Sequence, residues 1–407
     1  MESFGNFKLS SQLQESIKRM GYKEPTMVQE KSIPPIIEGK DLVGESATGS
    51  GKTLAFGCGI VEHTEAGKGL QALVLTPTRE LAEQVKNSLG QLSFHKRLNV
   101  IAIYGGVSIE PQISLLQRAD VVVATPGRLL DHLQRKTVNI SKVRLLVLDE
   151  ADRMLDMGFI DDVKQIIQQC RNRSQTLFFS ATISEDIRQL AQEYMKNPVQ
   201  VSAKKMVDPE KLKQVYYDVP KNMKLSLLVH LLKQEKAGLV MVFCNTRRTT
   251  DVVVKNLRSN DMDAIAIHGG LSQNKRTRTI SMFNKGKVSV LVCTDVAARG
   301  LHIDDVSHVY NYDIPKDPKD YVHRIGRTAR AGKEGKVVNL LCDYDYDNFS
   351  RILQEYRSFK IDSIERGYIE RIPFIADGPR MGHGREHPRS QQGRRPMQHR
   401  GGGRRRY

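Results

Sequence analysis

The chain has 407 residues, which is long enough for two domains that each bury a core. Its composition, 39% hydrophobic and 27% charged, is ordinary for a soluble globular protein. No apolar run is long enough to cross a membrane and the first residues lack a secretory pattern, so we expect a cytoplasmic protein. The five scattered cysteines form no CxxC pair, which favours buried reduced thiols over a zinc site or disulfides. The net charge of +17, with nine arginines between residues 378 and 407, favours a polyanionic partner such as nucleic acid.

Short β-branched apolar runs alternate with longer amphipathic stretches from about residue 41 to residue 203. The runs are DLVGES, ALVLTPT, NVIAIYGG, DVVVATPGR, RLLVLDE, TLFFSAT and PVQVS. Apolar strands separated by helices predict a doubly wound α/β domain with a parallel sheet. Ligands of such sheets bind beyond the carboxyl ends of the strands, so the polar strand endings are expected to form one reactive edge.

Residues 45 to 56 read ESATGSGKTLAF, and we find this pattern once in the chain. A strand before it and an apolar helix after it predict a nucleotide phosphate loop made of Ala47, Thr48, Gly49, Ser50, Gly51, Lys52 and Thr53. The glycines let backbone amides face phosphate, Lys52 reaches the terminal phosphates, and Thr53 is a Mg²⁺ ligand. The alternative is a glycine-rich turn without a ligand. Ser46 stands where the usual pattern begins with glycine.

The run LLVLDEAD, residues 145 to 152, places two acids at the end of an apolar strand. Asp149 is expected to hold Mg²⁺, and Glu150 to orient and polarise the attacking water. Acids at a strand end are often ordinary solvated turn residues, but the phosphate loop on the same predicted edge favours the catalytic interpretation.

After Val201 the polar stretch SAKKMVDPEKLKQ indicates a linker, and strands then resume with GLVMVFCNT, DAIAIHGG, VSVLVCTD, VSHVYNYD and KVVNLLCD. AIAIHGG echoes VIAIYGG, and VLVCTDVAARG echoes VVVATPGR, which suggests two related domains. GLVMVFC, taken as the first strand, runs into NTRRTT, so the second domain is interpreted as a partner without its own phosphate loop. The expected boundaries are 1–203, a linker at 204–211, 212–365, and a basic tail at 366–407 that is expected to be disordered.

The segment Asp149-Glu-Ala-Asp152 is the motif that names the DEAD-box family of RNA helicases, and the chain resembles this family along nearly its whole length. The resemblance implies two tandem RecA-like domains, with ATP, Mg²⁺ and RNA bound in the cleft between them. GYKEPTMVQ resembles the family's Q motif, which implies that Gln29 reads the adenine edge and that Phe7 packs on the base; Tyr22 belongs to the same ATP-binding set. In HRIGRTAR the resemblance implies that Arg327 and Arg330 enter the ATP site as catalytic arginines.

The family's remaining motifs imply two further sets of residues. The RNA-binding set, which suits a sugar-phosphate backbone and reads no bases, is Pro77, Thr78, Arg79, Gly105, Gly106, Thr125, Pro126, Gly127, Arg128, Gly270, Gln273, Arg276 and Thr294. Thr78 and Thr125 could instead be ordinary helix caps. The set that couples hydrolysis to strand separation is Asp152, Ser180, Thr182, Asp295, Arg299, His302, His323 and Arg324. His323 and Arg324 are expected to bridge to the SAT and DEAD segments.

Two positions depart from the family's pattern. His302 stands where many members carry an aspartate near the ribose, so we expect a changed nucleotide affinity with activity kept. Ala329 stands where glycine is common, a small-for-small change expected to matter little.

The expected activity is ATP-dependent local unwinding of short RNA duplexes or remodelling of RNA–protein complexes. A DNA helicase and a non-enzymatic RNA clamp or annealing chaperone are the alternatives. The arginine-rich tail is either a sequence-tolerant RNA tether or a solubilising extension. The residues leave open which RNA is bound and whether ribonucleoprotein or ribosome-assembly partners take part.

Overall fold

The structure is a computed structural model that describes residues 3–46, 49–203, 212–235, 237–298, 303, 306–329 and 334–376. Contacts divide the chain between Ile375 and Ala376, and all features below belong to the unit that ends at Ile375. In this unit we call residues 3–203 the first half and residues 212–375 the second half. The described residues form two seven-stranded sheets, and every neighbouring pair of strands is parallel.

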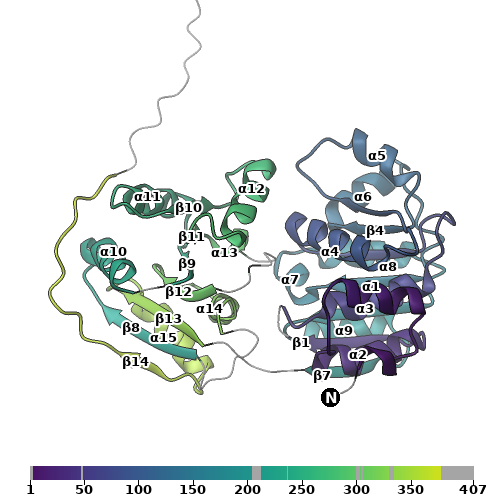
Figure 1. Ribbon diagram of the computed structural model, residues 1–407, viewed down its shortest axis with the longest axis horizontal. Coiled ribbons are helices and arrows are strands. Elements are labelled where there is room, and N and C mark those ends of the chain that lie inside the picture. Colours follow the sequence, from purple (N-terminus) through teal and green to yellow (C-terminus); the bar gives the residue numbers. More distant parts are fainter. Residues whose placement is uncertain are drawn as a thin grey trace, which may run out of the picture. The chain divides into compact units, whose positions relative to one another are not determined.

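The first sheet has the order β3-β4-β2-β5-β6-β1-β7 and is covered by helices (Figure 1). Its strands are β1 (Leu42–Ser46), β2 (Ala72–Leu75), β3 (Val100–Ile103), β4 (Val121–Ala124), β5 (Leu145–Asp149), β6 (Gln175–Ser180) and β7 (Val199–Ala203). Its helices are η1 (Phe4–Asn6), α1 (Ser11–Arg19), α2 (Met27–Ile37), α3 (Lys52–His63), α4 (Arg79–Leu92), α5 (Glu110–Leu116), α6 (Pro126–Gln134), α7 (Ala151–Asp156), α8 (Ile160–Gln169) and α9 (Glu185–Tyr194). The buried apolar strands predicted a parallel sheet, and this prediction is confirmed.

The second sheet has the order β10-β11-β9-β12-β13-β8-β14. Its strands are β8 (Leu212–Asp218), β9 (Leu239–Phe243), β10 (Ala264–Ile267), β11 (Val290–Cys293), β12 (Val306–Asn311), β13 (Gly335–Leu341) and β14 (Ile361–Ser363). Its helices are η2 (Lys221–Met223), α10 (Lys224–Gln234), α11 (Arg247–Arg258), α12 (Gln273–Asn284), α13 (Asp295–Ala298), α14 (Pro318–Ile325) and α15 (Tyr346–Glu355). The expected linker, residues 204–211, lies outside the described residues.

The two sheets have equivalent strand orders, which confirms that the halves are related, but the predicted place of the strand GLVMVFC is wrong. The echoing strands β3 and β10 both stand first in their sheets, and β4 and β11 both stand second. However, β9, which carries GLVMVFC, stands third like β2, whereas β8 stands sixth like the phosphate-loop strand β1. The prediction that GLVMVFC is the first strand of the second half and precedes the degenerate phosphate loop is therefore wrong. The equivalent loop follows β8.

The second half continues beyond the boundary expected at residue 365 as an extended segment, residues 366–375, which we call the strap. Figure 1 shows this yellow segment running from β14 past α10 toward α11. Ile369 is buried in the core cluster of the second half, and the backbone N–H of Ile372 donates to Ser226 on α10 at 3.2 Å. The buried side chain of Asn256 on α11 pairs with both the N–H and the C=O of Ile375, at 2.8 and 2.9 Å. The prediction of a disordered tail at 366–407 is therefore wrong for its first ten residues, and residues 377–407 of that tail lie outside the described residues.

Two composition-based predictions can be compared with the fold. All five cysteines are buried and free, which confirms the prediction of reduced thiols. Among the described residues, no helix is long and apolar enough to cross a membrane.

Candidate ATP and RNA site

The predicted phosphate loop lies between the carboxyl end of β1 and the first turn of α3. Lys52 is the first residue of α3, is buried, and donates from Nζ to the carbonyl oxygen of Ser46 at 3.0 Å. The Ser46 hydroxyl, at the position that departs from the usual pattern, lies 2.9 Å from the hydroxyl of Ser50 and so links the two ends of the loop. Gly49 and Gly51 have φ angles of +81° and +96°, which side chains rarely adopt. Thr53 follows Lys52 on α3, whereas Ala47 and Thr48 lie outside the described residues.

Gln29 connects the predicted adenine-reading segment to the phosphate loop. It is buried on α2, its Oε1 accepts from the Thr26 N–H at 2.9 Å, and its Nε2 donates to the Gly51 carbonyl at 3.1 Å. Thr26 Oγ1 donates to the Ser50 carbonyl at 2.7 Å, so the start of α2 holds the loop at two points. A carboxamide has two donors and two acceptor lone pairs, so Gln29 keeps one of each for a base edge.

The predicted aromatic residues of the ATP-binding set differ in their exposure. Phe7 is buried and packs edge-on against Phe4, with ring centroids 6.0 Å apart. Tyr22, which follows α1, is 42% exposed. Phe7 is therefore part of the hydrophobic core of the first half in this structure, whereas the Tyr22 side chain lies at the surface.

Asp149 ends β5 and Glu150 follows it, at the same carboxyl edge of the first sheet. Both side chains are buried. Burial raises the pKa of the Asp149 carboxyl to about 7, although the Lys52 ammonium opposes this shift and the Glu150 charge adds to it. Glu150 adopts a left-handed φ of +53° and pairs with Arg153 at 3.3 Å. A strained backbone and two buried acids beside a buried lysine are typical of a functional site rather than of a solvated turn.

Asp152 joins the DEAD segment to the SAT segment. Its Oδ2 accepts from the N–H of Ala181 at 3.1 Å, from the N–H of Thr182 at 2.9 Å, and from the Thr182 hydroxyl at 3.1 Å. Ser180 accepts from the Asp152 N–H at 3.2 Å and donates to the Thr182 carbonyl at 2.7 Å. The structure therefore brings together three of the predicted coupling residues, Asp152, Ser180 and Thr182.

The predicted RNA-contacting residues of the first half lie after β2, β3 and β4, at one edge of the sheet. Thr78, which follows Pro77, caps α4 by accepting from the Leu81 N–H at 3.3 Å, whereas Thr125, at the same position of α6, makes no side-chain capping bond.

Gly106, next to Gly105, has a φ of +76°, and a Cβ there would lie 2.0 Å from a guanidinium nitrogen of Arg79. Pro126 and Gly127 open α6, and Arg128 donates to the Val107 carbonyl at 3.0 Å. Two arginines and an uncommitted threonine hydroxyl suit a phosphate backbone.

The predicted RNA-contacting residues of the second half follow β10 and β11. The Gly270 N–H donates to Nδ1 of His268 at 3.1 Å, and Thr294 is buried directly after β11. Gln273 and Arg276 lie on α12, and both contact the Glu80 carboxylate, at 2.9 and 3.0 Å. Glu80, the glutamate of PTRELA, was not predicted as a site residue, because its side chain is an acid in a segment expected to bind an anion.

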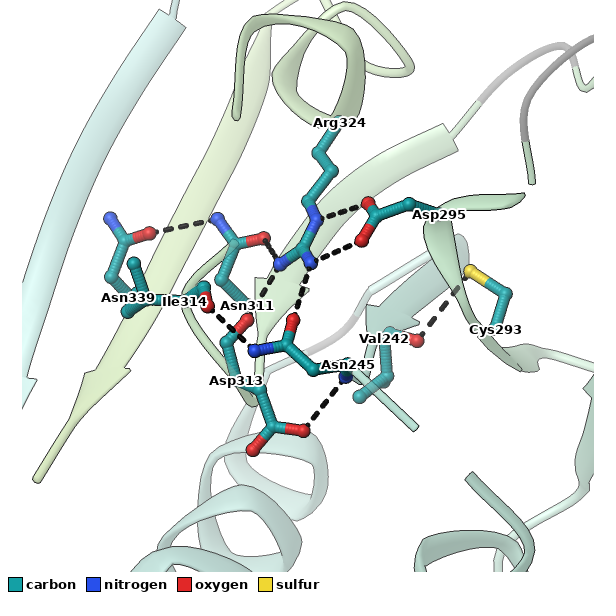
Figure 2. A network of polar contacts seen from close by, with 9 residues as sticks. All are labelled: Val242, Asn245, Cys293, Asp295, Asn311, Asp313, Ile314, Arg324 and Asn339. Carbon is teal, nitrogen blue, oxygen red and sulfur yellow. Dashed lines mark hydrogen bonds and ion pairs between the residues drawn. The ribbon is translucent and has the colours of Figure 1, made fainter. Parts of the chain in front are cut away.

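Arg324 occupies a different place from the one its family motif predicts. It is 1% exposed, and Figure 2 shows its guanidinium at the centre of a polar network inside the second half. Nε and Nη2 hold the two oxygens of Asp295 at 2.6 and 2.7 Å. The other donors bind Asn311 at 3.0 Å, the Asp313 carbonyl at 2.6 Å and Asn245 at 3.0 Å. All five N–H donors are thus used within the second half, and none is directed to the SAT or DEAD segments in this structure.

The predicted catalytic arginine Arg327 lies in the turn that follows α14. It is buried, and the next residue, Thr328, donates from its hydroxyl to the carbonyls of Val306 and Ser307 at 2.6 and 3.1 Å. Ala329 adopts a left-handed φ of +54°, so the replacement of glycine here carries backbone strain that its small size did not suggest. Arg330, Arg299 and His302 lie outside the described residues.

Comparisons with known proteins identify the families that the two halves match. Residues 26–190 match the DEAD/DEAH box helicase family, and residues 223–332 match the helicase conserved C-terminal domain. The chain is 45% identical over 359 residues to the ATP-dependent RNA helicase CshA of Listeria monocytogenes, covering 87% of this chain and 69% of that protein. The chain belongs to the DEAD-box helicase family. It is also 46% identical to the DEAD-box ATP-dependent RNA helicase CshA of Geobacillus kaustophilus, covering 84% of this chain and 74% of that DEAD-box protein.

Solved DEAD-box structures share the fold over most of the chain. S. cerevisiae Dbp5 bound to RNA and ADP BeF3 is 29% identical with a TM-score of 0.80, and the match covers 90% of this chain and 96% of that one. The DEAD-box helicase Mss116 bound to ssRNA and UDP-BeF is 29% identical with a TM-score of 0.81, covering 90% and 80%. These matches confirm two tandem RecA-like domains, the fold class that the family resemblance implied.

Proposed function

We propose that this chain is an ATP-dependent RNA helicase that binds RNA by its backbone and separates short duplexes locally. The observation that carries the proposal is the set of buried charges at the carboxyl edge of the first sheet, where Lys52, Asp149 and Glu150 meet the phosphate loop. Family membership supports the same activity.

Lys52 and the loop amides bind the ATP phosphates, and Gln29 hydrogen-bonds the adenine edge with its remaining donor and acceptor. Glu150 orients the attacking water, and its left-handed backbone and its ion pair with Arg153 fix the carboxylate. Arg327 supplies positive charge to the transferring phosphoryl group, a contribution of about 10³ to 10⁵ in rate in enzymes that use such an arginine. Arg330 has the same role in this proposal.

The acidic edge of the first sheet fits a Mg²⁺ ion. Asp149 is a buried carboxyl whose pKa is raised, which is the expected state of an oxygen ligand without its cation. Asp149 and the Thr53 hydroxyl would hold the ion together with the ATP phosphates and water, because Mg²⁺ is seldom held by protein groups alone. Within the described ranges, no group of three or more His, Cys, Asp or Glu side chains could hold a metal ion by itself. Bound Mg²⁺ would supply charge neutralisation at the phosphates.

RNA binding is expected to use both halves. The Arg79 and Arg128 guanidinium groups, the Thr125 hydroxyl and the N-termini of α4, α6 and α12 suit phosphate and sugar oxygens, and none of them reads a base. Gln273 and Arg276 reach RNA by exchanging their contacts with Glu80. Because ATP and RNA each favour the state in which Arg327 meets the phosphates, each tightens binding of the other.

The arginine-rich residues 378–407 act in this proposal as an RNA tether. The nine arginines provide the charge for sequence-tolerant contacts with phosphates. Deleting residues 378–407 is expected to weaken RNA binding and to flatten its salt dependence, because fewer counterions are then released. A salt slope equal to that of the full chain would leave the tail as a solubilising extension.

The catalytic assignment is tested with Lys52→Ala and Glu150→Gln, measured as ATP hydrolysis with and without RNA. Both variants are expected to lose RNA-stimulated turnover, by roughly 10²-fold or more for Glu150→Gln. Lys18→Ala and Glu65→Gln, which change exposed residues of the same half outside the predicted site, are the matched controls and should keep it. Persistent stimulation in either catalytic variant would reject the site. Stimulation by DNA equal to that by RNA would favour a DNA helicase, and no turnover in the unaltered chain would favour a clamp or annealing chaperone.

A further inference from the structure

The loop before α10 in the second half matches the phosphate loop before α3 in the first half. β8 and β1 both stand sixth in their sheets. β1 ends at Ser46 and α3 begins at Lys52, while β8 ends at Asp218 and α10 begins at Lys224, so five residues separate the strand from the α-helix in each half; in the second half the last three of them form η2. A lysine is the first residue of the helix in both cases, and both lysines are buried, at 6% exposure for Lys52 and 3% for Lys224.

The loop of the second half has nevertheless lost the features that wrap a phosphate. Its residues, 219–223, read VPKNM and contain no glycine, and Pro220 has no N–H to donate. Met223, directly before the helix, has a φ of −105°, whereas its counterpart Gly51 has a φ of +96°. The backbone of this loop therefore does not take the left-handed turn that aims amides at an anion in the first half.

A carboxylate of the chain itself neutralises the buried lysine. Lys224 Nζ lies 2.6 Å from Oδ2 of Asp345, and the side chains are only 4% and 9% exposed. The same oxygen accepts from the Cys342 N–H at 3.1 Å, and Oδ1 accepts from the Ile314 N–H at 3.4 Å. Asp345 thus receives the ammonium and two backbone amides, which is the kind of donor set that a phosphate loop presents to a phosphate oxygen.

We infer that Lys224 is the second half's counterpart of the phosphate-binding lysine, and that the Asp345 carboxylate stands in for the anionic ligand. The Asp345 carboxylate thereby occupies the position where a nucleotide phosphate would bind in the second half. A free anion can bind there only when this carboxylate is removed. The inference rests on the proposed phosphate site at Lys52 for its comparison, but its test uses no ATP, so the two can fail separately.

The test removes the internal anion and supplies a free one. The Asp345→Ala variant of the full chain removes the carboxylate partner of the buried Lys224, so its melting temperature is expected to fall by roughly 6 to 20 °C. Sodium acetate, which carries the missing carboxylate, and inorganic phosphate should then raise its melting temperature above that seen in sodium chloride of equal ionic strength. The unaltered chain and the double variant Lys224→Met/Asp345→Ala are the controls and should show no such rise. A response of Asp345→Ala no larger than that of the controls would overturn the inference.

A double-mutant cycle keeps the inference testable if Asp345→Ala does not fold. It compares the melting temperatures of Lys224→Met, Asp345→Leu and the combined variant. Because an apolar pair can replace a buried ion pair at little loss, the combined variant is expected to be more stable than either single variant. Additive losses would show that Lys224 and Asp345 do not neutralise each other, and would overturn the inference.

Discussion

Replacing Arg324 by lysine separates the structural role seen here from the coupling role that the family motif implies. The buried Arg324 directs five N–H donors to Asp295, Asn311, Asp313 and Asn245, in the network of Figure 2. A lysine keeps the charge but carries three donors on one nitrogen, so at least two of these five bonds are lost. At about 1.5–3 kcal/mol for each bond to a charged group, Arg324→Lys should cost the second half about 3–6 kcal/mol.

The assay is thermal unfolding followed by circular dichroism, in parallel with RNA-stimulated ATP hydrolysis below the transition. The loss corresponds to a fall of roughly 6 to 24 °C in the melting temperature of the second half. Arg248→Lys, which changes an exposed arginine on α11, is the matched control and should melt like the unaltered chain. If Arg324→Lys melts normally and yet loses its ATPase activity, the network is dispensable for stability, and Arg324 acts on the first half as the motif implies.

Three further predictions follow from backbone geometry and burial. Ala329→Gly should stabilise the second half by about 1 kcal/mol in denaturant unfolding, because glycine adopts the φ of +54° without strain; an unchanged or lower midpoint would contradict this. Gly51→Ala should abolish binding of a fluorescent ATP analogue, because the new Cβ would lie 2.2 Å from Nε2 of Gln29; Gly67→Ala, at a turn with open space, is the control for a positive φ alone. Burial raises the pKa of the Cys170 thiol from its ordinary value of 9.0 to about 12. At pH 8 the fraction of Cys170 present as thiolate is therefore about 10³-fold smaller than for an ordinary thiol, and alkylation of Cys170 in the folded chain should be correspondingly slow. Above pH 9 the unfolded chain loses a thiol proton that the folded chain keeps, so stability should fall there; rapid labelling of native Cys170 would contradict its burial.

The sequence predicted every strand of the first sheet and β9 to β13 of the second, but it missed β8 and β14. The first three residues of β8, Leu212 to Gln214, belong to the polar stretch SAKKMVDPEKLKQ that indicated a linker, and no strand was predicted there. In the fold Gln214 is buried, and its polar side chain is satisfied there because the hydroxyl of Tyr321, 107 residues along the chain, donates to its Oε1 at 2.9 Å. No local periodicity reports such a partner, and missing β8 also shifted the expected degenerate loop to the wrong strand.

The candidate site shows the same division between local and distant information. The residue types and spacing of the phosphate loop and of the DEAD segment were sufficient to predict Lys52, Asp149 and Glu150 at one edge of the first sheet. The network of Arg324 joins residues that follow different strands, and only the folded chain brings these together. The strap was likewise assigned to the tail, because Ile369 and Ile372 are isolated apolar residues in a charged segment, and only the folded chain packs them on the core of the second half.

The most direct test of the proposed activity is the release of a labelled strand from a short RNA duplex by the full chain, with and without ATP. We expect release with ATP, little release without it, and little release by Lys52→Ala. A DNA duplex of the same sequence should remain paired. Strand release that is equal with and without ATP, or equal for Lys52→Ala and the unaltered chain, would contradict an ATP-dependent RNA helicase.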